Sequence, residues 1–100
     1  MIVYEVNLSV NNSIYDKYRK WLKSHINEML AFKGFYKYKL YMVSSNEHLN
    51  QKEICIHYYI KSLEDLEYYF DNYAENMRLE GLNLFENNFS ASRRILSTLS

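Results

Sequence analysis

Side chains of types that can do chemistry occur in two places in this sequence, and the first place is a single histidine, His25. His25 lies near the centre of an apolar stripe whose members, such as Tyr18, Trp21 and Met29, recur every three or four residues. A histidine that points inward from a helix can act as a general base or contact a ligand, because its pKa is easily moved through neutrality. The alternative, which we favour, is a neutral core histidine bonded to a backbone carbonyl or a tyrosine hydroxyl.

The second group comes from alternating positions in four predicted strands. Period-two alternation places the following residues on one face of a predicted sheet: Glu5, Tyr41, His57, Tyr59 and Arg94. Polar groups that converge in an aromatic-lined space are typical of a small-molecule site. We therefore predict these five as ligand-binding residues, with His57 as a second candidate base beside His25. The alternative, which we favour, is that these groups form hydrogen bonds and salt bridges between subunits.

Other chemistry has little support in the sequence. Cys55 is the only cysteine, and the three histidines, which include His48 in a polar stretch, are dispersed, so we predict no metal site. With only two glycines there is no glycine-rich phosphate loop, and no serine has the setting of a catalytic nucleophile. We predict no cofactor. A lone cysteine also fits a reducing compartment, so we expect a cytoplasmic protein.

Six segments must position these residues. Apolar alternation predicts strands, and apolar spacing of three and four predicts helices. In chain order the elements are a strand over 2–9, a helix over 13–32, strands over 35–44 and 53–61, a helix over 63–80 and a strand over 89–96. A Ser-x-x-Asp capping box opens each helix, at Ser13 and at Ser62. We expect Gly34 to cap the first helix in a left-handed conformation and Gly81 to interrupt the second.

This order predicts the fold. Two β-α-β units in succession indicate a ferredoxin-like α+β sandwich, in which a four-stranded antiparallel sheet carries two helices on one face. Residues 1–100 are of the length of one such domain. The face of the sheet away from the helices is half apolar, since it is predicted to carry Val3, Phe35, Tyr41, Val43, Cys55, Tyr59 and Leu96. A second copy of the chain is the simplest cover for such a face, so we predict a homodimer through it.

Charge and hydropathy narrow the classes of partner. Twelve basic and twelve acidic residues give no net charge, which argues against a nucleic-acid-binding protein. The RNA-recognition module shares this order of elements, but its third strand needs outward aromatic residues, and only Tyr59 supplies one here. No apolar stretch approaches the length of a membrane span, and Glu5 and Asn7 interrupt the start of any signal sequence.

The sequence also resembles a small bacterial family of unknown function in the dimeric α/β-barrel superfamily. The resemblance rests on Ile2-Val3-Tyr4, on the segment from His25 to Leu30, on Tyr58 with Ser62 to Asp65, and on Arg78, Leu82, Phe85, Phe89 and Arg93. The chain has Asn27 where that family usually has proline, and Tyr73 and Glu75 where it tends to have histidine and proline. The resemblance implies a ferredoxin-like subunit whose sheet packs against that of its twin, with no assigned activity.

Two classes of function follow. The first, which we favour, is a non-catalytic homodimeric domain that binds a ligand or has a regulatory role, because no catalytic constellation can be assembled. The alternative is a cofactor-independent enzyme like the monooxygenases among the distant relatives in that superfamily, which also include haem-degrading enzymes, chlorite dismutases and ligand-binding regulators. Such an enzyme needs an apolar pocket and a base, which would be His25 or His57, with Tyr58, Tyr59 and Trp21 as walls. An enclosed cavity with an imidazole in its wall would favour catalysis.

Overall fold

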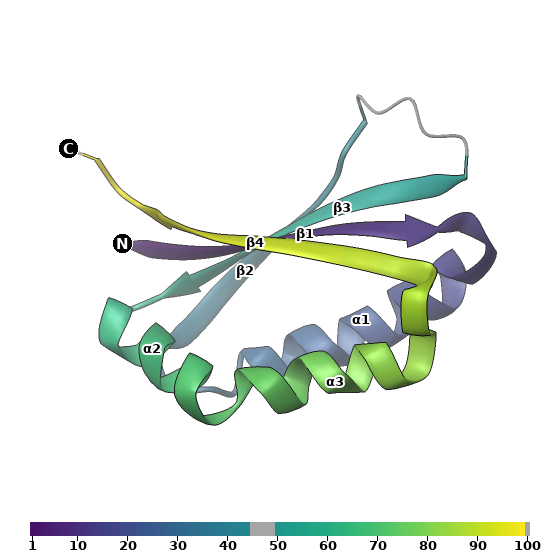
Figure 1. Ribbon diagram of the computed structural model, residues 1–100. Helices are drawn as coiled ribbons and strands as arrows, with labels where there is room; N and C mark the ends of the chain where they lie inside the picture. The colour runs from purple at the N-terminus through teal and green to yellow at the C-terminus, as the bar shows by residue number, and fades with distance from the viewer. Residues whose placement is uncertain (45–49, 100) are drawn as a thin grey trace.

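The computed structural model describes residues 1–44 and 50–99, and a four-stranded sheet with helices on one face makes up this part of the chain (Figure 1). The elements in order are β1 (Ile2–Asn11), η1 (Asn12–Ile14), α1 (Tyr15–Met29), β2 (Phe35–Met42), β3 (Gln51–Ile60), α2 (Leu63–Asn72), α3 (Ala74–Phe85), η2 (Glu86–Asn88) and β4 (Phe89–Ser97). His48 and most of the polar stretch 45–51 that the sequence predicts as a hairpin loop lie outside the described residues.

The sheet has the strand order β2-β3-β1-β4, and every neighbouring pair is antiparallel. This order and the helices on a single face confirm the ferredoxin-like β-α-β-β-α-β prediction. The register fixes which residues share a face, because cross-strand partners point the same way. Tyr4 pairs with Tyr58 and Ile95 on the helix side, whereas Glu5 pairs with His57 and Arg94 on the outer side.

The core lies between the sheet and the helices. It is formed by alternate residues of β1 and β3 and by the inward stripes of α1, α2 and α3, and its most buried members are Tyr18, Tyr58, Leu22, Met29, Ile56, Ile60, Leu66 and Val10. Tyrosine and phenylalanine rings supply much of this core, in a chain of tilted and edge-on contacts. Among the described residues, none of the helices combines the length and apolar character that crossing a bilayer requires.

Only one of the two predicted capping boxes forms. The Ser62 hydroxyl accepts a hydrogen bond from the Asp65 backbone N–H at 3.1 Å, as an N-cap should. Ser13 instead lies inside the 3₁₀ turn η1, and α1 begins at Tyr15 without a side-chain cap. The prediction for Ser13 is therefore wrong, because β1 continues to Asn11 and leaves the chain one tight turn in which to reverse.

The second helix is interrupted at Tyr73 and not at Gly81. Tyr73 leaves the helical region with φ −131°, and its ring stacks on Phe32 at 4.6 Å between centroids. Gly81 is helical and buried, since a Cβ at that position would lie 3.1 Å from the Trp21 ring. Glycine at this position permits the close approach of α3 to α1, because a Cβ would be tight against the Trp21 ring, and it does not break the helix. The spacing of apolar residues predicts that Leu63, Leu66, Phe70, Tyr73 and Met77 point inward, but Tyr69 is buried while Leu63 and Tyr73 are exposed.

A β-bulge near the start of β2 reverses one predicted orientation. Phe35 pairs with Ile60 and Lys37 with Tyr59, so Tyr36 is the extra residue. Phe35 is consequently buried in the core, although simple alternation places it on the outer face. After the bulge Tyr38, Leu40 and Met42 point to the helix side, but they stay about 40–50% exposed because β2 is an edge strand.

Gly34 has the predicted left-handed backbone, with φ +86°, but it does not cap α1. The helix ends at Met29 with Leu30 as its right-handed cap, and Gly34 lies in the turn that leads into β2. A Cβ at Gly34 would lie 2.4 Å from an Asp65 carboxylate oxygen. The turn therefore needs glycine both for its backbone angle and for the room beside Asp65.

Candidate functional site

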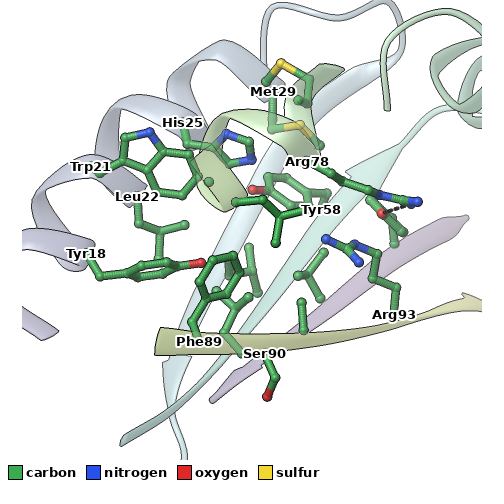
Figure 2. A pocket seen from close by; sticks show the side chains of 18 of the residues that line it. Tyr18, Trp21, Leu22, His25, Met29, Tyr58, Arg78, Phe89, Ser90 and Arg93 are labelled. Atoms are coloured by element: carbon green, nitrogen blue, oxygen red, sulfur yellow. Dashed lines mark hydrogen bonds between the residues drawn. The ribbon is translucent and has the colours of Figure 1, made fainter. Parts of the chain in front are cut away.

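A cavity of about 230 Å³ lies between the helices and the sheet (Figure 2). Its walls are mostly apolar and aromatic, and apart from tyrosine hydroxyls the polar groups that line them come from three elements: His25 of α1, Arg78 of α3, and Ser90 and Arg93 of β4. The remaining lining residues are Tyr4, Val6, Leu8, Tyr18, Trp21, Leu22, Met29, Ile56, Tyr58, Tyr69, Met77, Gly81, Leu82, Phe89 and Ala91. An apolar cavity with a few placed polar groups is the usual form of a small-molecule site.

His25 stands in the α1 wall of this cavity. Its ring stacks on that of Trp21, with centroids 4.6 Å apart and planes 24° apart (Figure 2). Its Nδ1 is buried and has no hydrogen-bond partner among the described residues. The nearest carboxylate oxygen, Glu80 Oε2, lies 4.0 Å from it, beyond hydrogen-bond reach. The sequence analysis favoured a core histidine with a hydrogen bond to a carbonyl or a tyrosine, but His25 has no such bond at Nδ1 among the described residues.

Burial sets the protonation of His25. Desolvation, followed by the positive charge of Arg93, lowers the pKa of His25 from 6.5 to about 4. At neutral pH the imidazole is uncharged, so Nδ1 or Nε2 carries a lone pair. An uncharged ring without a partner at Nδ1 is able to accept a hydrogen bond or donate one to a bound molecule.

The cavity is electropositive. Arg78 and Arg93 lie on one side of it, opposite Tyr18 and Trp21 (Figure 2). Arg78 donates to the Tyr4 hydroxyl at 3.1 Å, which fixes the guanidinium at the mouth. Among the described residues, no aspartate or glutamate lines the cavity. Two positive charges, with no carboxylate among the described lining residues, favour an anionic ligand.

Tyrosine hydroxyls are the other polar groups inside. Burial raises the pKa of Tyr18, Tyr58 and Tyr69 well above the ordinary value of 10. These phenols therefore stay protonated in the accessible pH range. They can offer hydrogen bonds to a bound molecule but cannot serve as phenolate bases.

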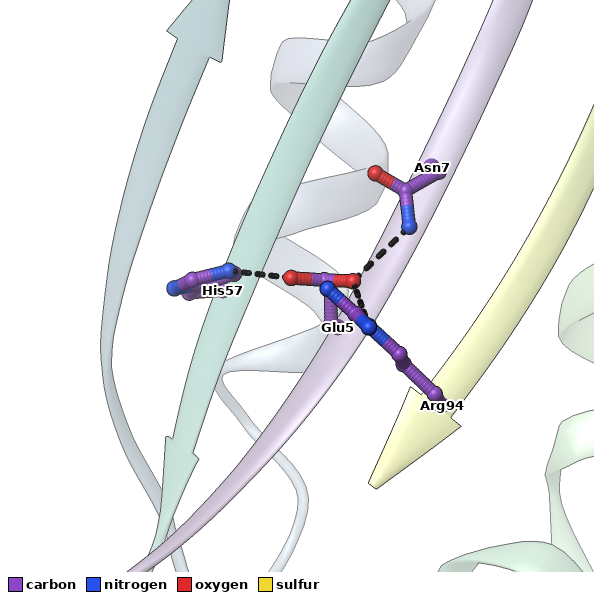
Figure 3. Close-up of polar contacts among 4 residues, drawn as sticks. All are labelled: Glu5, Asn7, His57 and Arg94. Atoms are coloured by element: carbon purple, nitrogen blue, oxygen red, sulfur yellow. Dashed lines mark hydrogen bonds and ion pairs between the residues drawn. The ribbon is translucent and has the colours of Figure 1, made fainter. Parts of the chain in front are cut away.

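A second polar cluster lies on the opposite, outer face of the sheet (Figure 3). The Glu5 carboxylate accepts from His57 Nε2 at 2.7 Å and from Asn7 Nδ2 at 2.9 Å, and Arg94 Nε donates to it from the other side. Glu5 is only 5% exposed. The hydrogen bond from Arg94 is the main cause that lowers the pKa of Glu5 to about 2, against the opposing effect of burial.

The structure brings together most, but not all, of the predicted outer-face residues. Tyr41 meets His57 edge-on, with ring centroids 5.4 Å apart, so it borders the Glu5 cluster. Tyr59 pairs with Val3, the next cross-strand pair on this face after Glu5 and His57. The Lys37 ammonium lies over its ring, 5.4 Å from the ring centroid. The outer cluster therefore consists of Glu5, His57 and Arg94, with Tyr41 at its edge.

The two candidate bases lie on different faces. His25 lines the cavity, whereas His57 belongs to the outer cluster, so they cannot act in one site. Of the walls predicted for an enzyme, Trp21 and Tyr58 line the cavity with His25, but Tyr59 faces away from it. His25 is therefore the candidate base that lies in the wall of a cavity, and this cavity is partly open to solvent.

The sheet register also places three metal-ligating side chains together. Glu5, Cys55 and His57 bring one donor atom each within 4.8 Å of the other two. Burial, and then the neighbouring Glu5 charge, raise the pKa of the Cys55 thiol. The sequence analysis predicted no metal site because the possible ligands are dispersed along the chain. The pairing of β1 with β3 brings these three residues together, so that argument does not apply to them.

Sequence reasoning missed the two arginines of the cavity. Arg93 and Arg94 are adjacent in β4, so one of them must face the helices and the other the outer side. Alternation around Phe89 and Ala91, which line the cavity, carries the signal that Arg93 shares their face. Arg78 gave no comparable signal, because the phase of α3 depends on the break at Tyr73.

Comparison with known proteins identifies the family. The family model described as Domain of unknown function (DUF4286) matches residues 1–99. The chain belongs to this family. The resemblance to a family of unknown function is thereby confirmed, and the sheet order given above confirms its ferredoxin-like fold. No curated protein matches the sequence.

Solved structures with the same fold include oxygenases. A candidate antibiotic biosynthesis monooxygenase from Deinococcus radiodurans aligns with a TM-score of 0.76 at 12% identity, covering 100% of this chain and 94% of its own. SnoaB, a cofactor-independent oxygenase from Streptomyces nogalater, aligns with a TM-score of 0.68 at 8% identity, covering 99% and 94%. A dimeric ferredoxin-like protein from an uncultured marine organism gives 0.64 at 15%, covering 99% and 97%. At these identities the likeness shows the fold alone.

Proposed function

We propose that this protein binds a small organic anion with an apolar, ring-containing body in the cavity between its helices and its sheet. The observation that carries the proposal is an aromatic-walled cavity of about 230 Å³ that, in the described part of the chain, is lined by two arginines and no carboxylate. The apolar body would lie against Trp21 and Tyr18, and the anionic group would lie toward Arg78 and Arg93, on the other side of the cavity.

The energies favour a charged ligand over a neutral one. A hydrogen bond to a charged group contributes about 1.5–3 kcal/mol, which is roughly 10- to 150-fold in affinity. Arg78 is already held by Tyr4 and loses little freedom when it binds. The apolar walls add affinity for the body of the ligand through burial, at about 25 cal/mol per Å².

A binding role fits His25 better than a catalytic one. A general base works best when its pKa is near the operating pH, and the pKa of His25 is about 4. The free protein therefore presents a weak base that is well suited to hydrogen bonding. This comparison ranks ligand binding ahead of proton abstraction for this cavity.

Trp21 offers a direct test of binding, because it is the only tryptophan and it lines the cavity. Phenylacetate and its neutral amide, phenylacetamide, form a matched pair of probes. We expect phenylacetate to change Trp21 fluorescence and to raise the melting temperature at concentrations where the amide does neither. Arg93→Gln should weaken phenylacetate at least about tenfold and leave the response to the amide unchanged.

Arg19→Gln is the control, since Arg19 lies on the exposed side of α1 and bonds Tyr15. It should bind phenylacetate like the wild type. Equal responses of the wild type to phenylacetate and phenylacetamide would contradict the proposed anion site. Equal binding of phenylacetate by the wild type and Arg93→Gln would contradict it as well.

A second candidate function is a cofactor-independent oxygenase, and the observation that favours it is the unpartnered His25 Nδ1 in the cavity wall. An anionic group bound next to His25 would raise its pKa toward neutrality and make it a stronger base. The deprotonated, electron-rich substrate would then supply the electrons that reduce dioxygen. The oxygenases among the proteins of similar fold support this candidate at the level of analogy.

Oxygen consumption separates the two candidates. A panel of electron-rich phenols is offered to the wild type and to His25→Gln in a closed oxygen electrode. Substrate-dependent oxygen uptake that His25→Gln abolishes would establish the enzyme. Binding by Trp21 fluorescence without oxygen uptake would leave the protein as a binding domain.

We also propose that the protein is a homodimer through the outer face of its sheet. That face carries half-buried apolar side chains beside the Glu5 cluster, namely Val3, Val43, Cys55, Tyr59 and Leu96. Apolar residues on a sheet face opposite the helices favour a cover, and closed homo-oligomers are the commonest solution. The cavity opens on the other side of the sheet, so ligand binding does not depend on this interface.

Light scattering at micromolar concentration tests the dimer. Tyr59→Asp, which puts a charge into the proposed interface, should give a folded monomer. Tyr68→Asp, at an exposed position of α2, should remain dimeric. A wild-type monomer, or a Tyr59→Asp dimer of unchanged strength, would overturn the proposed interface.

A further inference from the structure

Three different metal-ligating groups meet at one point of the outer sheet face. Glu5 lies directly opposite His57 in the pairing of β1 with β3, and Cys55 is two residues before His57 on the same face of β3. Their donor atoms, a carboxylate oxygen, a thiol sulfur and an imidazole nitrogen, all lie within 4.8 Å of one another. Unlike the acidic clusters common on protein surfaces, this one is built around a carboxylate whose side chain is only 6% exposed.

We propose that Glu5, Cys55 and His57 form a binding site for one divalent transition-metal ion of the Zn²⁺ class. Sulfur, nitrogen and oxygen donors are the set that zinc takes in proteins, and hard ions such as Mg²⁺ or Ca²⁺ do not favour it. Three protein ligands leave the fourth tetrahedral position for water or another small ligand.

The distances suit a zinc ion after a small adjustment. Zinc lies about 2.0–2.3 Å from each ligand atom, so tetrahedral oxygen and nitrogen ligands stand about 3.3 Å apart. His57 Nε2 and Glu5 Oε2 are now 2.7 Å apart, joined by a hydrogen bond. The pair must therefore separate by about 0.6 Å as the ion replaces the shared proton.

The surrounding groups support a ligand role for one oxygen of Glu5. Asn7 and Arg94 both donate to Oε1, while Oε2 faces His57 (Figure 3). Oε2 can thus exchange its hydrogen bond from His57 for a metal ion while Oε1 stays held, as outer partners usually hold metal-binding carboxylates. The Cys55 thiol would lose its proton on binding, so its thiolate and the Glu5 carboxylate offset two of the three positive charges that the ion and Arg94 bring together.

The site is separate from the proposed ligand cavity and complete within one chain. Its three residues lie on the outer face, and none of them lines the cavity. It therefore requires neither the anion nor the dimer. If two sheets do face each other, each chain would carry its own ion between them.

Zinc titration and cobalt spectroscopy test the site on the full chain. Isothermal titration calorimetry should show one Zn²⁺ per chain, and Co²⁺ should give the intense near-ultraviolet absorption of a thiolate–cobalt bond. Cys55→Ser should remove that absorption, and both Cys55→Ser and His57→Gln should weaken Zn²⁺ at least about tenfold. Glu53→Gln, a carboxylate of the same strand and face, should bind Zn²⁺ like the wild type.

Each unfavourable result is decisive. A cobalt complex without thiolate absorption, or Zn²⁺ binding of equal strength in wild type, Cys55→Ser and His57→Gln, would overturn the site. We expect both variants to fold, because both substitutions are close in size and the residues are only half-buried. Circular dichroism of the two variants checks this. Failure of phenylacetate binding or of dimerisation would leave this result unaffected.

Discussion

Replacing His25 with glutamine should flatten the loss of stability that the protein shows on mild acidification. The pKa of His25 is 6.5 in the unfolded chain and about 4 in the folded protein, because burial and the nearby Arg93 disfavour its charged form. The unfolded chain therefore binds the proton more readily than the folded one. The stabilising contribution is complete above pH 6.5 and declines as the pH falls toward 4.

The size of the effect follows from these two values. Between pH 7.5 and pH 5.0 the difference in proton binding lowers the free energy of unfolding by about 2 kcal/mol. The carboxylate of Glu5 adds little in this interval, because its stabilising contribution declines only below an unfolded pKa of 4.5. The other charged groups near the ring, Glu80 at 4.0 Å and Arg93, remain in the variant.

Urea unfolding at pH 7.5, 6.5, 5.5 and 5.0 measures the effect in wild type and His25→Gln. Taking the difference between the two proteins cancels the titration of all other groups. We expect about 2 kcal/mol of acid-side loss that is present in the wild type and absent in the variant. NMR titration of the His25 ring should independently give a pKa of about 4.

Two results would refute this reasoning. One is an equal loss of stability in wild type and His25→Gln between pH 7.5 and 5.0. The other is a His25 pKa at or above 6.5 in the folded protein, which would mean that the ring is either solvated or paired with an acid. Glu80 is the nearest carboxylate, so Glu80→Gln would then identify the pair.

Three further predictions concern stability. Gly34→Ala should lower the free energy of unfolding by more than about 1 kcal/mol, because alanine is strained at φ +86° and its Cβ meets Asp65; a neutral result in urea would contradict this. Leu66→Ala removes a side chain with 0% exposure and should cost about 2–5 kcal/mol, against less than about 0.5 kcal/mol for exposed Glu64→Gln. Glu5→Gln should lower the free energy of unfolding by about 1–3 kcal/mol at pH 7. It should also abolish the loss of stability that Glu5 gives the wild type from about pH 5 toward pH 2, because a carboxylate with a depressed pKa stabilises the fold only while it is ionised. Thermal melts at pH 7 and pH 3 test both points.

The sequence by itself determined the order of the elements and the two faces of most strands. Alternation in 2–9 and 53–61 is regular, and the structure buries the predicted side of each. Helical spacing through Tyr18, Leu22 and Met29 likewise identified the inward stripe of α1. These features are local, since period two and period 3.6 are properties of the chain's own geometry.

Features that depend on how elements meet were not predicted. The bulge at Tyr36 inverted the orientation of Phe35, and the break at Tyr73 decided which side of α3 faces the cavity. Gly81 looked like a helix breaker, but the position of Trp21 makes it a point of close contact. Each of these outcomes is set by a neighbour far away in sequence, which no local pattern encodes.

The same division applies to the candidate sites. Alternation alone placed Glu5, His57 and Arg94 on one face, because each lies at a definite position of a regular strand. Only the tertiary structure put a cavity beside His25, because its walls come from three helices and three strands at once. Only the register of β1 against β3 brought Cys55 within ligand distance of Glu5, since a shift of one residue would have turned one of them to the other face.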